Sequence, residues 1–398
     1  METMPNLRHL RAFCSVAQCH SISRASDQVH LSQPAITQAI SKLEAELDTA
    51  LFERKSDGMY LTDAGTIWLT RVNLAINYLE RAVSSVQPKG SNSAQLIHQI
   101  TTTQLRSLTA ITRHHSFSEA GRQLNISQSS VHRSGKELEL CLGVVLFLKS
   151  KQGVTPTPAA ETLARASKLA FNEIQQGYHD IRALKNIDTS MLTIGSMPLP
   201  RTVLLPEVIN RFTEKKPTVS IRLIEGSYDD LLHHLRYGDI DFLIGALRLP
   251  GKTADIVQHR LFDAPLALIA RYDHPIFATP DVTLETLSRF PWIVPKQGTP
   301  TRSAFDRVFK DAAMEQAGKL VESTSQILIR EVLLGSDRLS IISPHQIRFE
   351  LDNQLLRTIP YRLPQTSRPI GYAVREGFIP TATQKAFLEE LKTVASSF

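Results

Sequence analysis

The sequence of 398 residues has few of the features that mark secreted, membrane-spanning or metal-binding proteins. Its three cysteines, Cys14, Cys19 and Cys141, form no CxxC motif and have no zinc-type spacing to histidine. Reduced thiols are therefore favoured over a disulfide framework. No apolar run is long enough to span a bilayer, and the first residues lack the apolar segment of a signal peptide. We expect a cytoplasmic protein.

Signatures of catalysis are also missing. The sequence contains no nucleophile elbow and no other pattern of a catalytic triad. The segment ALRLPGKT, from Ala246, fits only the loosest phosphate-loop pattern, and a strand-like segment follows where a phosphate loop needs a helix. The adjacent pairs His114-His115 and His233-His234 point in different directions on a helix, which argues against metal binding. We expect no catalytic residues, no metal and no enzyme activity.

Length and charge instead favour several domains and an anionic partner. Hydrophobic residues make up 42% and charged residues 21%, as in globular proteins. A chain of 398 residues exceeds one ordinary hydrophobic core. The net charge of +6 favours an anion as partner without specifying nucleic acid.

The most informative feature is an internal repeat. The segment LSQPAITQAISKLE, from Leu31, returns as ISQSSVHRSGKELE from Ile126, 95 positions later. The same offset aligns SISRASDQVHLSQ with SFSEAGRQLNISQ. Core packing could repeat the leucines, but it would not repeat the polar Ser-Gln pair, so the chain contains a duplicated unit. We name its halves copy one (residues 5–65) and copy two (residues 100–157).

Copy one has the pattern of a winged helix-turn-helix. Ser23 is a candidate cap for a short second helix, and His30-Leu31 forms the turn. Ser32 then caps a third helix whose first turn holds Pro34. Asp57-Gly58 predicts a two-residue hairpin, the wing. Helix, turn, helix and wing together predict a DNA-binding domain.

The outer face of the third helix suits DNA. Gln38 can pair with an adenine edge, and the hydroxyls of Thr37 or Ser41 can reach bases or phosphates. Free backbone N–H groups at the helix start favour a phosphate oxygen, and cations on the wing can touch the backbone or the minor groove. The predicted DNA-binding residues are Ser32, Gln33, Pro34, Thr37, Gln38, Ser41, Lys42, Arg54 and Lys55. The alternative is a solvated helix of an αα-hairpin, which the winged hairpin disfavours.

The segments SISRASDQVHLSQPAITQAISKLEAEL and LFERKSDGMYLTDAG resemble the DNA-binding domain of LysR-type transcriptional regulators. Asp48 stands where that family prefers a glycine to end the recognition helix, and aspartate tolerates the left-handed conformation. We expect a linker or dimerisation helix over residues 66–86. The segment QPKGSNSAQ predicts a flexible linker over residues 87–99.

Copy two departs from this pattern. Gly135 replaces the inward Ile40, at a cost of about 1 kcal/mol in helix propensity. Its outer face suits phosphates better than bases, and possible DNA contacts are Ser127, Gln128, Ser129, His132, Arg133 and Lys136. Auxiliary DNA binding, assembly of subunits and a degenerate spacer remain open, and we favour the first. A second linker helix is expected over residues 158–187.

The C-terminal half alternates short strands with helices from Met191 onward, which predicts a parallel α/β sheet. It resembles the two-lobed effector-binding domain of the same regulators, which has the periplasmic-binding-protein fold. We expect lobe 1 over residues 190–264 and 370–398 and lobe 2 over residues 265–369. The predicted fold is thus multidomain: two winged helix-turn-helix domains with long linker helices, then this α/β effector domain.

Two segments of that domain offer cations and hydroxyls where strands end and helices begin, which suits a carboxylate or another anion. The predicted effector-binding residues are Ser196, Arg201, Thr202, Gly245, Lys296, Thr299, Thr301 and Arg302. Ordinary surface charges and helix caps are the alternative interpretation of these residues.

The combined prediction is a sequence-specific transcription regulator whose operator binding responds to a small organic anion between the lobes. The resemblance implies a homodimer or homotetramer on double-stranded DNA. The alternatives are an effector-independent architectural DNA-binding protein and a solute-binding protein.

Overall fold

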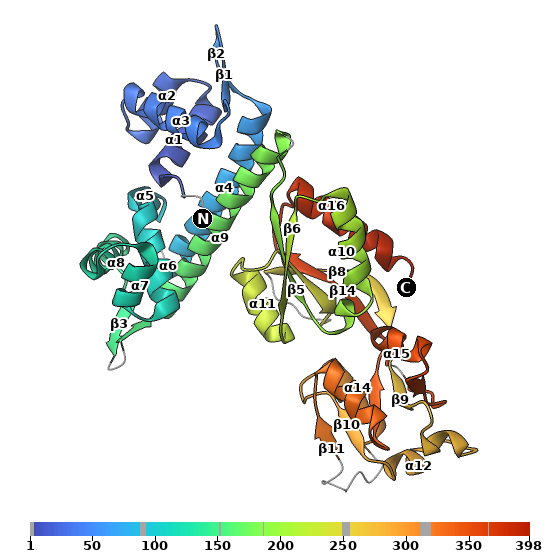
Figure 1. The fold of residues 1–398 in the computed structure, drawn as a ribbon. Coiled ribbons are helices and arrows are strands. Elements are labelled where there is room, and N and C mark those ends of the chain that lie inside the picture. Colours follow the sequence, from blue (N-terminus) through green and yellow to red (C-terminus); the bar gives the residue numbers. More distant parts are fainter. Residues whose placement is uncertain are drawn as a thin grey trace. The chain divides into compact units, whose positions relative to one another are not determined.

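The computed structural model describes residues 4–87, 93–150, 153–185, 187–248, 255–310, 320–364 and 366–398. The chain divides into two compact units, Met1–Ser190 and Met191–Phe398 (Figure 1). The first unit holds both copies of the repeat, and the second is the α/β half.

The two copies have the same order of elements. Copy one contains α1 (Leu7–Cys19), α2 (Ile22–Val29), α3 (Gln33–Leu47), β1 (Phe52–Lys55) and β2 (Gly58–Leu61), and it leads into α4 (Asp63–Val86). Copy two contains α6 (Thr102–His114), α7 (Phe117–Leu124), α8 (Gln128–Leu142), β3 (Phe147–Ser150) and β4 (Gly153–Pro156), and it leads into α9 (Pro158–Leu184). Each element of copy two begins 95 positions after its counterpart. Both winged helix-turn-helix folds are confirmed.

Local capping explains why these elements begin and end where they do. Ser32 and Ser127 cap α3 and α8 through their hydroxyl oxygens. Asp48 ends α3 in the left-handed region at φ 49°, as expected. The prediction for α2 was wrong by two residues. Its cap is Ser21, whose extended backbone lets its hydroxyl accept the Arg24 N–H, so Ser23 lies inside the helix.

The flexible linker predicted over residues 87–99 is also corrected. Residues 88–92 lie outside the described residues, but Ser93–Gln99 forms helix α5. Ile97 is buried, and the carbonyls of Ile97 and His98 accept hydrogen bonds from the Arg11 guanidinium. Tertiary packing of an apolar turn therefore overrides the polar composition of this segment.

Helices α4 and α9 pack along each other within the first unit (Figure 1). Near the start of α4, the Trp68 ring meets Tyr178, near the end of α9, at 5.2 Å between centroids. At the other end of α4, the Gln87 amide donates to the Leu142 carbonyl of copy two at 2.5 Å. The two helices therefore run antiparallel. The helix predicted over residues 66–86 thus packs against α9.

The second unit has two sheets, each with parallel and antiparallel neighbours. Lobe 1 has strand order β6-β5-β7-β14-β8, and lobe 2 has β11-β10-β12-β9-β13. The lobe 1 strands are β5 (Met191–Ser196), β6 (Ser220–Glu225), β7 (Phe242–Ala246), β8 (Ile256–Ala264) and β14 (Arg368–Arg375), with η1 (Leu199–Arg201), α10 (Leu204–Lys215), α11 (Tyr228–Arg236) and α16 (Ala382–Ala395). The lobe 2 strands are β9 (Ala267–Arg271), β10 (Trp292–Val294), β11 (Leu320–Glu322), β12 (Leu339–Ile342) and β13 (Leu356–Thr358), with η2 (Pro275–Ala278), α12 (Leu284–Ser288), α13 (Pro300–Val308), α14 (Gln326–Leu334), η3 (Pro344–Ile347) and α15 (Arg348–Asp352).

The chain passes between the lobes at two neighbouring points. Arg368, at the start of β14, pairs with Ala264, at the end of β8. The predicted start of the returning segment, residue 370, is therefore two residues late. The prediction of parallel strands is confirmed for β5 with its neighbours β6 and β7. In contrast, β14 runs antiparallel to both its neighbours, because it enters lobe 1 from lobe 2.

Candidate nucleic-acid interface and effector site

The outer face of α3 forms a polar ridge, which we define as Pro34, Gln38 and Ser41. All three residues are exposed, and Lys42 beside them is exposed as well. The opposite face of the helix is anchored by Ile36 and other fully buried apolar residues. Because its inner face is held in the core, the helix presents this ridge rigidly, as insertion into a major groove requires.

The remaining predicted residues of α3 are partly engaged. The Thr37 hydroxyl donates to the Gln33 carbonyl at 3.0 Å, so this half-buried group serves the helix itself. The Gln33 side-chain amide donates to the Ser23 hydroxyl at 3.3 Å. The Ser32 hydroxyl accepts the Ala35 N–H. The side chains of Ser32, Gln33 and Thr37 thus make hydrogen bonds within copy one itself.

The wing is fixed to the body of copy one. The Met59 N–H donates to the His20 carbonyl at 3.0 Å, and a Cβ at Gly58 would lie 2.6 Å from that same oxygen. Only glycine allows this close approach. The wing thereby holds Arg54 and Lys55, both exposed, at a set position beside α3.

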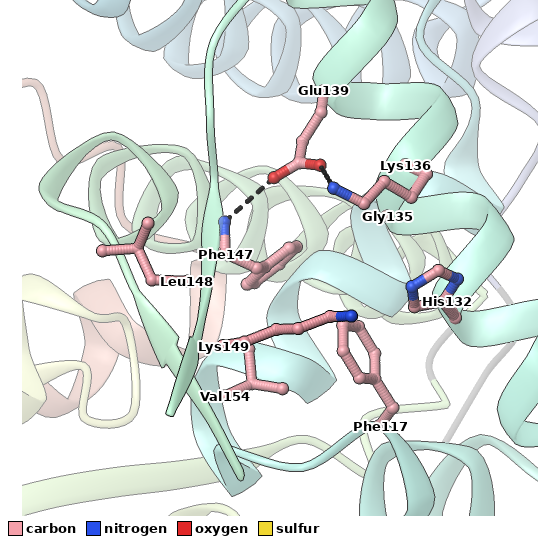
Figure 2. A pocket seen from close by; sticks show the side chains of 9 residues that line it. All are labelled: Phe117, His132, Gly135, Lys136, Glu139, Phe147, Leu148, Lys149 and Val154. Atoms are coloured by element: carbon pink, nitrogen blue, oxygen red, sulfur yellow. Dashed lines mark hydrogen bonds and ion pairs between the residues drawn. The ribbon is translucent and has the colours of Figure 1, made fainter. Parts of the chain in front are cut away.

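Copy two places its candidate residues on the corresponding surface, but its cations have carboxylate partners. Ser127, Gln128, Ser129, His132, Arg133 and Lys136 are all exposed. Arg133 lies 3.8 Å from Glu137, in an exposed pair. The Lys136 ammonium lies 2.6 Å from Glu139 (Figure 2).

Glu139 joins the helix of copy two to its wing. One carboxylate oxygen accepts the N–H groups of Leu146 at 2.8 Å and Phe147 at 3.0 Å. Burial opposes ionisation, but the hydrogen bonds from Lys136 and from these two backbone groups outweigh it and hold the pKa of Glu139 below its usual value. Glu44 makes the equivalent contacts in copy one.

Gly135 leaves a small hollow where copy one has an isoleucine. The space, about 30 Å³, is lined by side chains of α7, α8 and the wing, including Phe117, His132 and Phe147 (Figure 2). That volume is far below the roughly 300 Å³ or more of a typical small-molecule pocket. The hollow is a packing defect and not a ligand site.

The lobe 1 effector candidates lie around the end of β5. Ser196 is fully buried, and its hydroxyl donates to the Met197 carbonyl at 3.1 Å. Gly245 packs against the Met197 side chain, where a Cβ would come within 2.5 Å of the sulfur. The Arg201 guanidinium donates to Glu225, and the Thr202 hydroxyl donates to the Leu199 carbonyl at 3.0 Å.

The lobe 2 candidates gather at the start of α13. Thr299 caps the helix, and Lys296 is exposed just before it. Arg302 is 7% exposed and donates to Asp306 at 2.7 Å and to Glu322. Burial disfavours its charge, but the two carboxylates outweigh burial and raise the pKa of Arg302. Its charge is therefore balanced inside the protein.

Sequence reasoning missed Arg368. Its guanidinium donates to the Thr301 hydroxyl, which links the crossing strand β14 to α13 of lobe 2. Its Nε has no hydrogen-bond partner among the residues that the structure describes. Burial lowers the pKa of Arg368 to about 10. A lone arginine at a strand start carries no local pattern that would have indicated this position.

The described segments contain no helix that is long and apolar enough to cross a membrane, and no group of three or more metal-ligating side chains.

Comparison with known proteins agrees with this architecture. The HTH-type transcriptional regulator GalR of Pseudomonas putida is 32% identical over 391 residues, 98% of either chain. The model of the lysR family of bacterial regulatory helix-turn-helix proteins matches residues 7–66 and again residues 102–161, and the LysR substrate binding domain matches residues 187–396. The chain belongs to the LysR family. It is a DNA-binding transcription regulator with two helix-turn-helix domains and a domain for small-molecule effectors, not an enzyme.

Three further similar proteins are more distant than GalR. CfxR of Cupriavidus necator is 25% identical over 258 residues, 65% of this chain and 80% of CfxR. A full-length OxyR variant from Pseudomonas aeruginosa shares the fold with a TM-score of 0.54 at 24% identity, over 74% of this chain and 94% of OxyR. CbnR in complex with its target DNA has a TM-score of 0.52 at 19% identity, over 74% of this chain and all of CbnR (100%). The solved relatives thus leave part of this chain unmatched, whereas the GalR alignment spans both copies.

Proposed function

We propose that the polar ridge of copy one reads the bases of the operator and that the wing cations Arg54 and Lys55 contact its backbone. The observation that carries this proposal is the exposure of Gln38 and Ser41 on a helix whose inner face is anchored in the core. Glutamine can make two hydrogen bonds to the edge of an adenine, and a serine hydroxyl can donate or accept a hydrogen bond at a base edge. Replacing Gln38 with alanine is expected to reduce operator affinity and to relax the preference at one base pair.

Copy two, in our proposal, adds a weaker contact to phosphates through Arg133 and Lys136. The pair of Arg133 with Glu137 is exposed and long, so a phosphate can compete for the guanidinium. Lys136 is held more closely by Glu139, so Arg133 is the stronger candidate.

A salt series tests the contribution of copy two. Arg133→Ala with Lys136→Ala is expected to flatten the dependence of log affinity on log salt by about one per lost phosphate contact. Arg122→Ala is the matched control, because Arg122 is an exposed arginine of copy two that pairs with Glu119 at 2.6 Å outside the recognition helix. If the slope of the double variant equals that of the control, Arg133 and Lys136 do not contact phosphates.

We further propose that the effector is a small organic anion held between the lobes near Ser196, Thr202, Lys296 and Thr299. Arg368 supports this proposal, because a guanidinium with one N–H unpaired favours an added acceptor. Arg201, Gly245, Thr301 and Arg302 would shape the site, since the structure engages them in internal contacts.

Thermal unfolding with a panel of organic acids tests the effector. A matching acid at 100 times its Kd is expected to stabilise the protein by about 2.7 kcal/mol, and Arg368→Gln should remove that gain. Stabilisation by no acid in a broad panel would favour an effector-independent architectural role instead. We place the protein in the cytoplasm as a homodimer or homotetramer on double-stranded DNA.

A further inference from the structure

Equivalent parts of the two copies meet each other in the first unit. The Leu7 N–H donates to the Thr102 hydroxyl at 3.1 Å, and these two residues occupy the same position in their copies, 95 residues apart. Near the two ends of the helix pair, Gln87 reaches Leu142 and Lys185 reaches Asp48. The first unit therefore has the arrangement of a two-fold dimer made from one chain (Figure 1).

The shapes of α4 and α9 are complementary to each other and not to themselves. Trp68 lies against Gly177, where a Cβ would come within 2.8 Å of the indole ring. The residues that replace these two in the other copy are Leu163 and Ala82, both buried. In a pair of two α4 helices, Trp68 would face the Cβ of Ala82. In a pair of two α9 helices, Leu163 would face Gly177 and leave a void.

The buried charges are likewise complementary between α4 and α9 and not within a pair of identical helices. Arg71 is 3% exposed and lies 2.9 Å from Glu173 and 2.8 Å from Asp180. The positions in α4 that correspond to these carboxylates are Tyr78 and Ser85. Two α4 helices would therefore bury arginines without carboxylates, and two α9 helices would bury carboxylates without an arginine.

We propose that α4 and α9 close on each other within one chain, so that a single chain grips one operator segment with two unlike winged helices. This inference rests on the proposed DNA-binding function. Copy one contributes the base-reading ridge, and copy two contributes Arg133 and Lys136, which suit the phosphate backbone. The operator segment under one chain therefore has one half with a defined sequence and one half without it.

A zero-length carbodiimide cross-link tests the pairing in the full chain. The Lys185 ammonium lies 2.8 Å from the Asp48 carboxylate, so this reagent joins them in the wild-type protein. A chain with Asp48→Asn and a differently tagged chain with Lys185→Gln are then expressed together. Each chain lacks one of the two reactive groups. A link between these positions can therefore form only if copy one of one chain packs against α9 of the other chain.

Mass spectrometry is expected to find the Asp48–Lys185 link in the wild type and not in the mixed pair. The ion pair of Lys215 with Glu390 is present in every sample and serves as the internal control for reactivity. A link in the mixed pair would overturn the proposal, because the helices would then pair between chains. Loss of the link in the wild type would overturn it too.

Selection of DNA from a random duplex pool tests the consequence for the operator. The selected sites are expected to carry a defined half without a mirrored half one helical turn away (about 10 base pairs). An inverted repeat at that spacing would refute the proposal that one chain binds two unlike half-sites, but it would agree with base reading by the ridge. Failure to select any sequence would instead refute the proposed function.

Discussion

The buried charge cluster between α4 and α9 gives the sharpest prediction for stability. Arg71→Met removes the cation and leaves Glu173, 5% exposed, and Asp180, 13% exposed, facing each other without it. Removing one partner of a buried ion pair costs about 3–5 kcal/mol, because the remaining charge keeps its desolvation penalty. For a unit of this size, that loss corresponds to about 6–20 °C in the midpoint of unfolding.

Thermal and urea unfolding of the full chain measure this loss in the transition of the first unit. Arg81→Met is the matched control, because it removes the same charge from an exposed position of the same helix. Adding Glu173→Gln and Asp180→Asn to Arg71→Met should recover at least about 2 kcal/mol, since the two side chains then carry no charge to desolvate. If Arg71→Met changes stability no more than Arg81→Met does, the buried cluster does not hold the helices together.

Three further outcomes follow from the geometry of copy two and of the helix pair. Gly135→Ala should stabilise the first unit by about 0.5–1 kcal/mol in urea unfolding, since the nearest atoms to the new methyl group are those of Phe147 at 3.3 Å and Ile111 at 3.5 Å, beside a hollow into which the Phe147 ring can shift. A clear loss of stability would show that the Phe147 ring cannot shift. Glu139→Gln should cost about 1–3 kcal/mol at neutral pH, because two buried N–H groups lose a charged acceptor. Because folding lowers the pKa of Glu139, this deficit should be full above its ordinary pKa of 4.5 and should shrink as the pH falls through the lower folded-state pKa; a deficit that does not change with pH would contradict the ionised role. Gly177→Leu should disrupt α4 and α9 packing against Trp68 and lower the unfolding midpoint, whereas the same change at the exposed Glu161 should not.

Features set by neighbouring residues could be predicted from the sequence. The Ser32 cap and the left-handed end of α3 at Asp48 each depend on a few adjacent positions. The hairpin was predicted on the same basis, but its two-residue turn is Ser56-Asp57, one position before the predicted Asp57-Gly58, because Gly58 already pairs with Lys55 as the first residue of β2. The 95-residue offset then transferred the whole pattern to copy two. The exposed ridge followed from helical periodicity, because the inner face had to be apolar.

Features set by distant contacts could not be predicted in this way. Helix α5 forms where Ile97 gains burial from residues far along the chain. The partner of α4 depends on how Trp68 meets Gly177, which no local pattern encodes. In the effector domain, the carboxylates around Arg302 and the approach of Arg368 to Thr301 join separate segments. The sequence showed that cations lie at the starts of helices. It did not show which of these cations are paired with carboxylates in the folded protein.

Base reading by the ridge of copy one is tested most directly by comparing the DNA sequences that the wild type selects with those that Gln38→Ala selects. Gln18→Ala, a change to another exposed glutamine of copy one, is the control. The Gln38 variant is expected to lose its preference at one base pair, with a loss of about 1–3 kcal/mol in discrimination between bases there. The control is expected to select the same DNA sequence as the wild type. Unchanged sequence preference and affinity in the Gln38 variant would contradict the assignment of base reading to this helix.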